Sequence, residues 1–463
     1  MSTAFPSQTS DDRLRDALSG AFSQLNLKAL SALEAKPAAD ARRAFRFNPK
    51  AFDAEPKVAS LVRQNGLLRW EFAAANRIAV GHGLRAGRAA LIPGEIVHQF
   101  EFEELPPNQV SQAITWVDRK LTPAAWLGGK AIHGLRRLQN GNPVDYVLDS
   151  KIASEKRVFL LVHGTASNCD KLLSDLQAAP GGPEFLAALD KAYDLVLAFD
   201  HPTLSISPMV NAVDLAGLLR PSSGRKPPKQ IDIVCHSRGG LVTRWFCEAF
   251  ADPATRHRAI LVGAPIAGTS LAAPPNLKKA LDFITNVTEI LEKAADAFSA
   301  EPFIALTGAL LKAFNLAVNL TAKTPLPDLV LQIIPGLAAQ QRVGNNAEID
   351  RLRRYTGDAV TGGASVEYFA VKSNFNPEDP GWNILGYFSK PLQRIVNAGA
   401  DLIFECPNDL VVDTGSMDEV ADRRTLAKDH LLDFGDSTTV HHTNYFRQKR
   451  TVDFIRQRFA VRG

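Results

Sequence analysis

Cysteine is scarce in this chain, with four residues among 463. They stand at positions 169, 235, 247 and 406, and their spacing fits neither a zinc-binding pair nor a disulfide framework. A disulfide-stapled scaffold and a cysteine zinc site are therefore excluded. The pattern is typical of proteins from a reducing compartment.

The sequence also lacks an export signal and a membrane-spanning run. Residues 1–7 contain neither the basic segment nor the apolar run of a signal peptide. The most apolar long stretch, residues 303–320, carries Lys312 and two asparagines, which a bilayer would penalise and an amphipathic helix accommodates. We therefore expect a cytoplasmic protein without a spanning helix.

Neither sign of charge is in large excess. Lys and Arg number 53 and Asp and Glu 49, which gives a net charge of +4. The densest basic group, residues 351–354, has the pattern of a solvated helix face, so nucleic acid is not expected as a partner. Hydrophobic residues make up 45% of the chain, enough for the core of one large domain with additions.

Short apolar runs bounded by loops recur along the chain. Such runs are typical of strands covered on both faces, and their spacing leaves room for helices between them. The fold class is therefore α/β, with a mainly parallel central sheet flanked by helices and with ligand chemistry at the carboxyl ends of the strands. The candidate strands are residues 95–102, 144–148, 158–162, 195–199, 231–234, 260–262, 366–371 and 402–406.

Two regions depart from this strand–helix rhythm. Residues 1–85 are rich in alanine and arginine, with helix-like spacing near their start, and predict a mostly helical accessory region before a main domain at residues 86–463. Residues 272–335 offer apolar side chains at helical spacing and no strong strand. We expect this insertion to cap the catalytic edge of the main domain, in preference to packing on its flank.

The sequence from Ile233 to Leu241, IVCHSRGGL, lies between an apolar strand candidate and a helix candidate. A serine on such a turn stands out of the sheet, within reach of a histidine and of a carbonyl substrate. Ser237 is therefore the candidate nucleophile, although Cys235 replaces the first glycine of the usual pattern. His236 is expected to pack or orient rather than act as the base.

An acid and a base are expected later in the chain. Asp409 follows the strand candidate 402–406 and is the candidate acid, with Asp413 and Asp379 in reserve. Two histidines, His441 and His442, compete for the role of base. We prefer His442, because it directly precedes a segment whose Tyr445 and Phe446 could anchor the loop.

Two backbone NH groups are expected to form the oxyanion hole. One belongs to Arg238, directly after the nucleophile, and the other to Thr165, which follows His163 and Gly164 at the end of a strand candidate. His163 is expected to be part of the loop architecture.

These motifs resemble the α/β-hydrolase superfamily, and within it the lipase-like serine esterases. The likeness rests on residues 163–165, 235–240, 263–269, 408–412 and 441–442. Residues 200–205 look like a segment of a bacterial branch near the GPI inositol-deacylase type. The first 85 residues fall outside the resemblance, and Leu410 stands where many lipases have glycine.

The resemblance implies the α/β-hydrolase fold and hydrolysis of carboxylic esters through an acyl-enzyme, with no metal and no cofactor. The expected substrate is a small-molecule or lipid ester, and the apolar cap is expected to make transient contact with a membrane surface. A thioesterase or amidase with the same triad is the nearest alternative, because the motifs specify acyl transfer and not the leaving group. A hydrolase-fold interaction or effector module that binds its partner through residues 1–85 is the alternative from another class.

Overall fold

The computed structural model divides the chain into two compact units, Met1–Val117 with Leu277–Ile333 and Asp118–Asn276 with Ile334–Gly463. The structure describes residues 14, 18, 27–29, 44–46, 57–64, 66–74, 91–93, 95–102, 115, 118, 133–146, 157–220, 226–273, 277–293, 303–304, 306–308, 310–311, 334–342, 344, 346–357, 366–378, 406–421 and 424–461.

The larger unit is built on an eight-stranded sheet with the order β16-β13-β12-β11-β9-β10-β7-β8. The strands from β16 to β10 pair in parallel, and β7 and β8 continue the sheet in antiparallel fashion. The bounds are β7 Gly134–Gln139, β8 Asn142–Tyr146, β9 Arg157–Val162, β10 Leu195–Asp200, β11 Gln230–His236, β12 Arg256–Val262, β13 Val366–Phe375 and β16 Leu431–Ser437.

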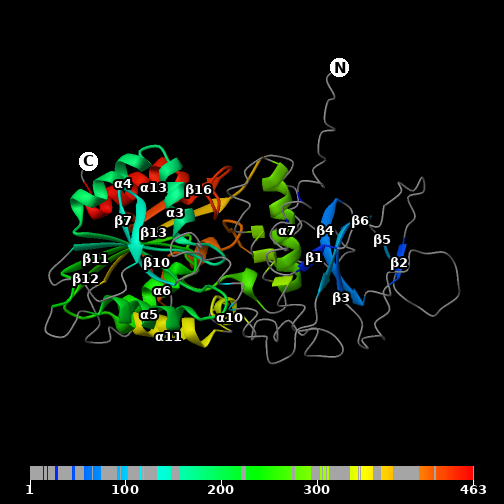
Figure 1. Ribbon diagram of the computed structural model, residues 1–463, viewed down its shortest axis with the longest axis horizontal. Helices are drawn as coiled ribbons and strands as arrows, with labels where there is room; N and C mark the ends of the chain where they lie inside the picture. The colour runs from blue at the N-terminus through cyan, green and yellow to red at the C-terminus, as the bar shows by residue number, and fades with distance from the viewer. Residues whose placement is uncertain are drawn as a thin grey trace, which may run out of the picture. The chain divides into compact units, whose positions relative to one another are not determined.

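Helices cover both faces of this sheet (Figure 1). Alternate residues of β9 point to opposite faces, so Phe159 and Leu161 join one apolar cluster while Val158 and Leu160 join the other. The first cluster is closed by α3 (Cys169–Ala178), α4 (Gly182–Ala192) and α13 (Lys449–Phe459). The second is closed by α5 (Pro208–Leu219), α6 (Gly239–Trp245) and α11 (Ala347–Gly357).

A mainly parallel sheet between two helical layers is the arrangement of the α/β-hydrolase fold, which confirms the predicted fold class. Most of the expected strands are present. The expected strand at 402–406 falls largely outside the described residues, and β16 had not been expected. Shorter elements complete this unit: η3 Phe246–Phe250, η4 Ser270–Ala272, α10 Pro335–Ala338, η8 Thr414–Ser416, β14 Glu419–Ala421, β15 Arg424–Thr425, η9 Lys428–His430 and η10 Tyr445–Arg447.

The smaller unit contains strands in the N-terminal region that had been expected to be mostly helical. Its described residues form an antiparallel sheet with the order β1-β6-β3-β4, and a separate pair, β2 with β5. The bounds are β1 Leu27–Ala29, β2 Ala44–Arg46, β3 Lys57–Gln64, β4 Leu67–Ala74, β5 Leu91–Pro93 and β6 Glu95–Phe102. β6, which lies after the expected boundary at residue 85, pairs with β3, which lies before it.

The strand pattern was present in the sequence. Leu68 and Trp70 are buried, whereas Arg69 and Glu71 between and after them are partly exposed, which is the two-residue period of a sheet with one covered face. Gly66, with φ of 81°, lies in the turn between β3 and β4.

The long helix of the expected cap belongs to this smaller unit. Helix α7 (Leu277–Lys293) packs against β4, and its Asp282 and Asn286 side chains accept hydrogen bonds from the backbone NH groups of Trp70 and Leu68 at 2.8 and 2.9 Å. Residues 277–333, most of the expected insertion, cluster with the N-terminal strands.

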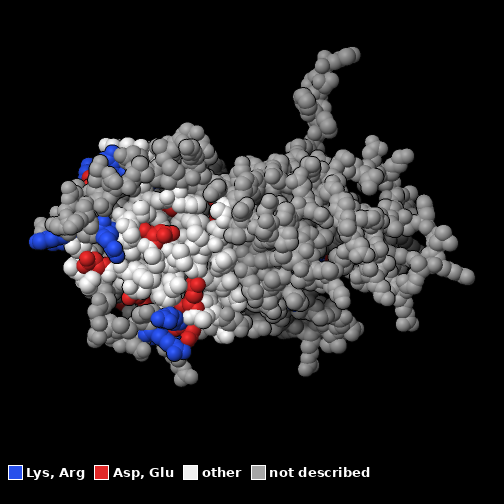
Figure 2. All heavy atoms as spheres, turned by 60° about the horizontal axis from the view of Figure 1, so that its bottom comes forward, with Lys and Arg blue, Asp and Glu red and all other residues white. Residues whose placement is uncertain are grey.

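Figure 2 shows mostly uncharged residues where the surface is coloured by charge. In that part of the surface, Lys and Arg gather in small groups separated from one another, as do Asp and Glu. Within the described ranges, no helix combines the length and the hydropathy needed to cross a bilayer.

Candidate active site

Ser237 occupies the sharp turn between β11 and α6. Its φ of 52° lies in the left-handed region, which a non-glycine residue adopts at a cost of about 1 to 3 kcal/mol. The backbone NH of Ser237 donates to Val262 O at 2.9 Å, which ties the turn to the end of β12. The turn therefore has the strained geometry of a nucleophile elbow.

The turn depends on small neighbours. A Cβ atom on Gly164 would lie 2.7 Å from Ser237 Cβ, and one on Gly239 would lie 2.5 Å from His163 O. Cys235, in place of the first glycine, is fully buried, and its thiol donates to Ile260 O at 3.4 Å. Burial raises the pKa of this thiol to about 12, so Cys235 is a packing residue here.

Asp409 is fully buried in the loop after β13. Its Oδ1 atom accepts hydrogen bonds from the backbone NH groups of Val411 and Val412, at 3.1 and 2.8 Å. Leu410 has a φ of 88°, a conformation that glycine adopts freely and that leucine adopts only at a cost. The local turn thus directs Oδ2, the other carboxylate oxygen, to the groups that follow it in the chain.

Those groups are His442 and Tyr445. His442 Nδ1 and the Tyr445 hydroxyl each lie 2.9 Å from Asp409 Oδ2, and the backbone NH of His442 donates to Asp409 O at 2.9 Å. The contact with a carboxylate places the proton of the neutral imidazole on Nδ1 and leaves Nε2 free to accept one. The sequence had indicated Tyr445 only as an anchor of the loop.

His441 lies in a different environment. Its Nδ1 atom is 3.2 Å from Thr443 Oγ1, and its ring meets that of Phe375 edge-on at 5.3 Å. Of the two competing histidines, His442 is therefore the one that pairs with Asp409.

His236 and Gly263 bring the elbow and the histidine loop together. His236 Nε2 donates to His442 O at 2.8 Å, and the two rings lie 4.8 Å apart, so His236 supports the loop as expected. A Cβ atom on Gly263, directly after Val262, would lie 3.3 Å from both Asp409 Oδ2 and His442 Nδ1. Among the described residues, Ser237 Oγ makes no hydrogen bond, and catalytic contacts of this kind often tighten only when substrate binds.

The candidate oxyanion loop, residues 163–166, follows β9 beside the elbow. Within the described part of the chain, the backbone NH groups of Thr165 and Arg238 have no hydrogen-bond acceptor. Burial lowers the pKa of His163 to about 3, so its ring is neutral. The ring bridges Gly164 O, through Nδ1 at 3.0 Å, and the backbone NH of His201, through Nε2 at 3.1 Å, which is the architectural role expected for it.

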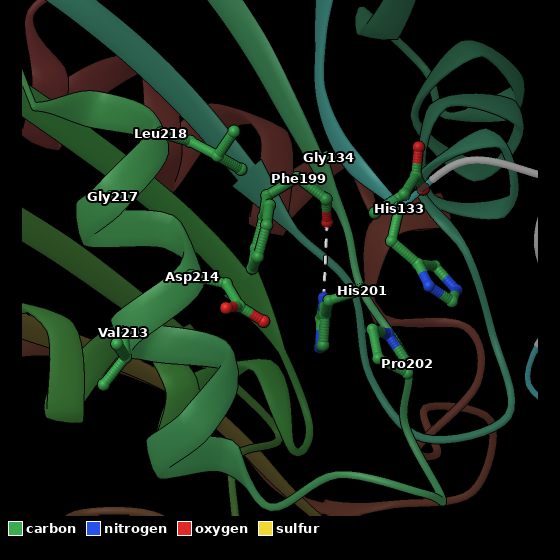
Figure 3. A pocket seen from close by; sticks show the side chains of 10 residues that line it. His133, Gly134, Phe199, His201, Pro202, Val213, Asp214, Gly217 and Leu218 are labelled. Carbon is green, nitrogen blue, oxygen red and sulfur yellow. Dashed lines mark hydrogen bonds between the residues drawn. The ribbon is translucent and has the colours of Figure 1, made fainter. Parts of the chain in front are cut away.

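A cavity of about 390 Å³ opens at the carboxyl end of β10 (Figure 3). Phe199, His201 and Leu218 line it together with Asp214 of α5. Ser237, Asp409 and His442 are not among its lining residues, so this cavity is separate from the candidate catalytic residues.

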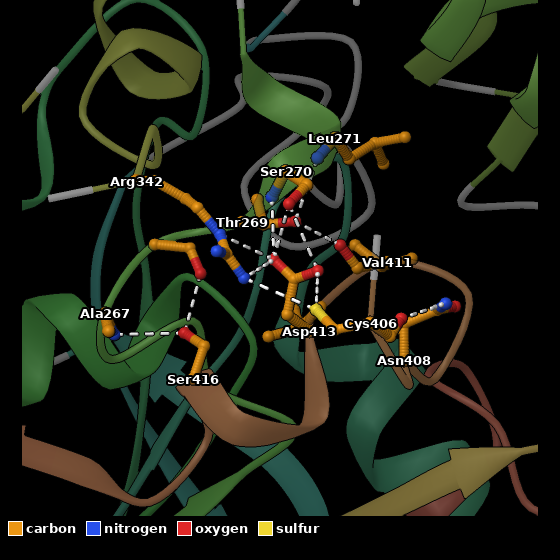
Figure 4. Close-up of polar contacts among 12 residues, drawn as sticks. Ala267, Thr269, Ser270, Leu271, Arg342, Cys406, Asn408, Val411, Asp413 and Ser416 are labelled. Carbon is orange, nitrogen blue, oxygen red and sulfur yellow. Dashed lines mark hydrogen bonds and ion pairs between the residues drawn. The ribbon is translucent and has the colours of Figure 1, made fainter. Parts of the chain in front are cut away.

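The carboxylate of Asp413, the reserve candidate acid, is bound by residues outside the candidate triad (Figure 4). Its carboxylate accepts from the backbone NH of Ser270 at 2.9 Å, pairs with Arg342 at 3.0 Å and accepts the Cys406 thiol proton at 3.1 Å. The second reserve, Asp379, lies outside the described residues. In the described ranges, no three His, Cys, Asp or Glu side chains gather as a metal site would require.

A family model described as a domain of unknown function, DUF7379, matches residues 133–460. The chain belongs to this family. The match spans β7 to α13 and includes all of the candidate catalytic residues. A search of curated proteins found no relative of this sequence.

Several solved structures resemble the DUF7379 chain. The mature lipase BlEst2 of Bacillus licheniformis is 15% identical with a TM-score of 0.35, covering 68% of this chain and 96% of its own. Lipase 1 from Pelosinus fermentans is 13% identical with a TM-score of 0.38, covering 66% and 98%. The lin2722 gene product of Listeria innocua is 12% identical with a TM-score of 0.34, covering 65% and 93%. Likeness at this level carries no information on activity.

Proposed function

We propose that this DUF7379 protein is a serine hydrolase that cleaves carboxylic esters. Ser237 is the nucleophile, His442 the general base, Asp409 the residue that orients the imidazole, and the NH groups of Arg238 and Thr165 form the oxyanion hole. The observation that carries the proposal is the hydrogen bond from His442 Nδ1 to buried Asp409, together with the left-handed backbone of Ser237, whose neighbour His236 bonds to His442 O.

The reaction follows from these roles. Ser237 Oγ attacks the ester carbonyl carbon while His442 Nε2 takes the hydroxyl proton, and the negative charge that develops on the carbonyl oxygen is held by the two NH groups. The C–O bond to the leaving group then breaks, and His442 returns its proton to the departing alkoxide. Water, deprotonated by His442, attacks the acyl-enzyme and releases the carboxylic acid together with free Ser237.

The substrate class we favour is an ester with an acyl chain or lipid portion, and we place the protein near the GPI inositol-deacylase type on the likeness of residues 200–205. A panel of p-nitrophenyl esters from acetate to palmitate measures the preferred acyl length. Acyl thioesters and anilides assayed beside them distinguish esterase activity from thioesterase and amidase activity.

A fluorophosphonate probe tests the assignment of the nucleophile. We expect the wild-type protein to be labelled and Ser237→Ala to remain unlabelled. The control is Ser174→Ala, on the exposed side of α3, which should label like the wild type. Equal labelling of Ser237→Ala, or no labelling of folded wild-type protein, would overturn the proposal.

A further inference from the structure

Asp118 lies almost fully buried at the start of the larger unit, outside the region matched by the family model. Its Oδ1 atom accepts hydrogen bonds from the backbone NH groups of Thr203 and Leu204 at 2.8 and 2.9 Å, and its Oδ2 atom accepts from the backbone NH of Ser205 at 2.7 Å. One carboxylate therefore fixes three consecutive peptide groups after β10. These contacts account for the fixed conformation of residues 203–205, which belong to the segment 200–205 noted in the sequence.

The hydroxyl of Thr203 connects Asp118 to the candidate oxyanion loop by hydrogen bonds. This hydroxyl lies 3.3 Å from Asp118 Oδ1, to which it donates, and accepts from the backbone NH of Ala166 at 3.2 Å. Ala166 has a φ of 51°, a left-handed conformation that an alanine holds only under outside restraint. Ala166 directly follows Thr165, so this hydrogen bond sets the direction of the peptide chain at the oxyanion donor.

A second connection runs from the same segment to Thr165. Gly336 of α10 donates its backbone NH to Leu204 O at 3.0 Å and accepts from Gln340 Nε2 at 2.7 Å. Gln340 Oε1 in turn accepts the Thr165 hydroxyl at 3.1 Å. The loop held by Asp118 is thus linked to residues 165 and 166 by two separate hydrogen-bonded routes.

Asp118 also acts on the other oxyanion residue. The Arg238 guanidinium is fully buried and donates to Ile206 O and to Asn211 Oδ1, the latter at 2.7 Å. Burial lowers the pKa of Arg238 to about 10, and the negative charges of Asp118 and Glu348 oppose that effect. Asp118 therefore supplies part of the charge that compensates a buried cation on the residue next to Ser237.

We propose that Asp118 is a positioning residue for the oxyanion hole, and that it acts through the Thr203 hydroxyl on the backbone of Thr165 and Ala166. This inference rests on the proposed function. A displaced donor would weaken the hold on the tetrahedral intermediate while leaving ground-state binding of the ester nearly unchanged.

Substitutions at Thr203 test the relay without removing a charge. Thr203→Val keeps the shape and removes the hydroxyl, whereas Thr203→Ser keeps the hydroxyl. With p-nitrophenyl butyrate, we expect Thr203→Val to lower kcat by about 10- to 100-fold with KM within about threefold, and Thr203→Ser to recover most of kcat. Inhibition by a trifluoromethyl ketone, which forms a tetrahedral adduct, should weaken in parallel with kcat.

The matched control is Thr451→Val in α13. Thr451 is fully buried, and its hydroxyl has no hydrogen-bond partner among the described residues, so the same substitution there removes a buried hydroxyl without touching the relay. Its kcat should stay at the wild-type value. Circular dichroism verifies that each variant is folded, and Asp118→Asn, where it folds, should lower kcat at least as much as Thr203→Val.

The outcomes separate the two proposals. Folded wild-type protein that neither hydrolyses the ester nor reacts with a fluorophosphonate contradicts the proposed function. Active wild-type protein with Thr203→Val unchanged in kcat and in ketone inhibition contradicts the role of Asp118 alone. A loss in Thr203→Val that Thr203→Ser does not recover, or that appears only as a higher KM, also contradicts it.

Discussion

The hydroxyl of Tyr445 donates a hydrogen bond of 2.9 Å to Asp409 Oδ2, the same oxygen that His442 Nδ1 contacts. Tyr445 and Asp409 are both fully buried. Burial together with the negative charge of Asp409 raises the pKa of Tyr445 well above its ordinary value. The phenol therefore remains protonated and remains a donor. It fixes the carboxylate on the side opposite to the backbone NH groups that hold Oδ1.

Tyr445→Phe should impair catalysis by changing Asp409 rather than by removing a reacting group. With one donor fewer, the carboxylate is held less firmly and orients the imidazole of His442 less well. We expect kcat on p-nitrophenyl acetate to fall by about 3- to 30-fold and the free energy of unfolding to fall by about 1 to 3 kcal/mol. Ester hydrolysis at constant pH and urea denaturation measure these effects.

Phe446→Leu is the control for Tyr445→Phe, because it changes a neighbouring buried ring, which packs against His236, and removes no hydrogen-bonding group. It should lower stability and leave kcat near the wild-type value. A kcat that is unchanged in Tyr445→Phe, or that falls equally in Phe446→Leu, would show that the hydroxyl does not position Asp409.

Alanine substitutions distinguish the adjacent histidines. His442→Ala removes the proposed base, and we expect kcat on p-nitrophenyl acetate to fall by about a thousandfold or more. His441→Ala loses a ring contact with Phe375 and a hydrogen bond to Thr443, and should stay within about tenfold of the wild type. Similar losses in both variants would contradict the assignment of His442.

The edge of the sheet that carries the proposed catalytic residues could be predicted from the sequence because its signals are local. A run such as residues 158–162 is apolar throughout, since both faces of the central sheet are covered, and the elbow combines a strand, a small-residue turn and a helix within a few positions. Ser237 could therefore be placed on its turn from the sequence. Asp409 and His442 were predicted to act together because an acid and then a base are expected after the serine in the chain. In the structure a hydrogen bond joins them.

The residues that support this edge gave no such signal. Asp118 is 85 positions from Thr203, and its neighbours in sequence carry no motif, so only the folded chain reveals the contact. β16 was missed because its LLDFGDS sequence contains two aspartates and a glycine, which an edge strand tolerates. The N-terminal strands were missed because alanine-rich composition was given more weight than the alternation of Leu68 and Trp70 with Arg69 and Glu71.

Leu410 offers a test of backbone strain beside Asp409, the proposed catalytic acid. Its side chain is fully buried, so both Leu410→Ala and Leu410→Gly should lose about 2 to 5 kcal/mol of stability. Because φ is 88°, glycine should be better tolerated than alanine by about 1 kcal/mol, the reverse of the usual order. Denaturation midpoints of the two variants measure the difference, and alanine proving the more stable would contradict the strain.

Asp282 of α7 should make the smaller unit sensitive to pH. Burial raises its pKa from 3.8 to about 7, although Lys278 lowers it in part. The folded state therefore binds the proton more tightly than the unfolded state. The stabilisation is complete below about pH 4 and is lost as pH rises to about 7, by at most about 1.4 kcal/mol per pH unit.

Asp282→Asn removes this titration while its amide oxygen can still accept from the backbone NH of Trp70. Urea denaturation followed by tryptophan fluorescence should show that the wild type loses about 1 to 3 kcal/mol more than the variant between about pH 5 and pH 8. Asp453→Asn, on the exposed face of α13, controls for the loss of a negative charge and should keep the wild-type slope. Parallel pH profiles of the wild type and Asp282→Asn would mean that Asp282 is ionised in the folded protein throughout this range, so that Lys278 outweighs burial at this site.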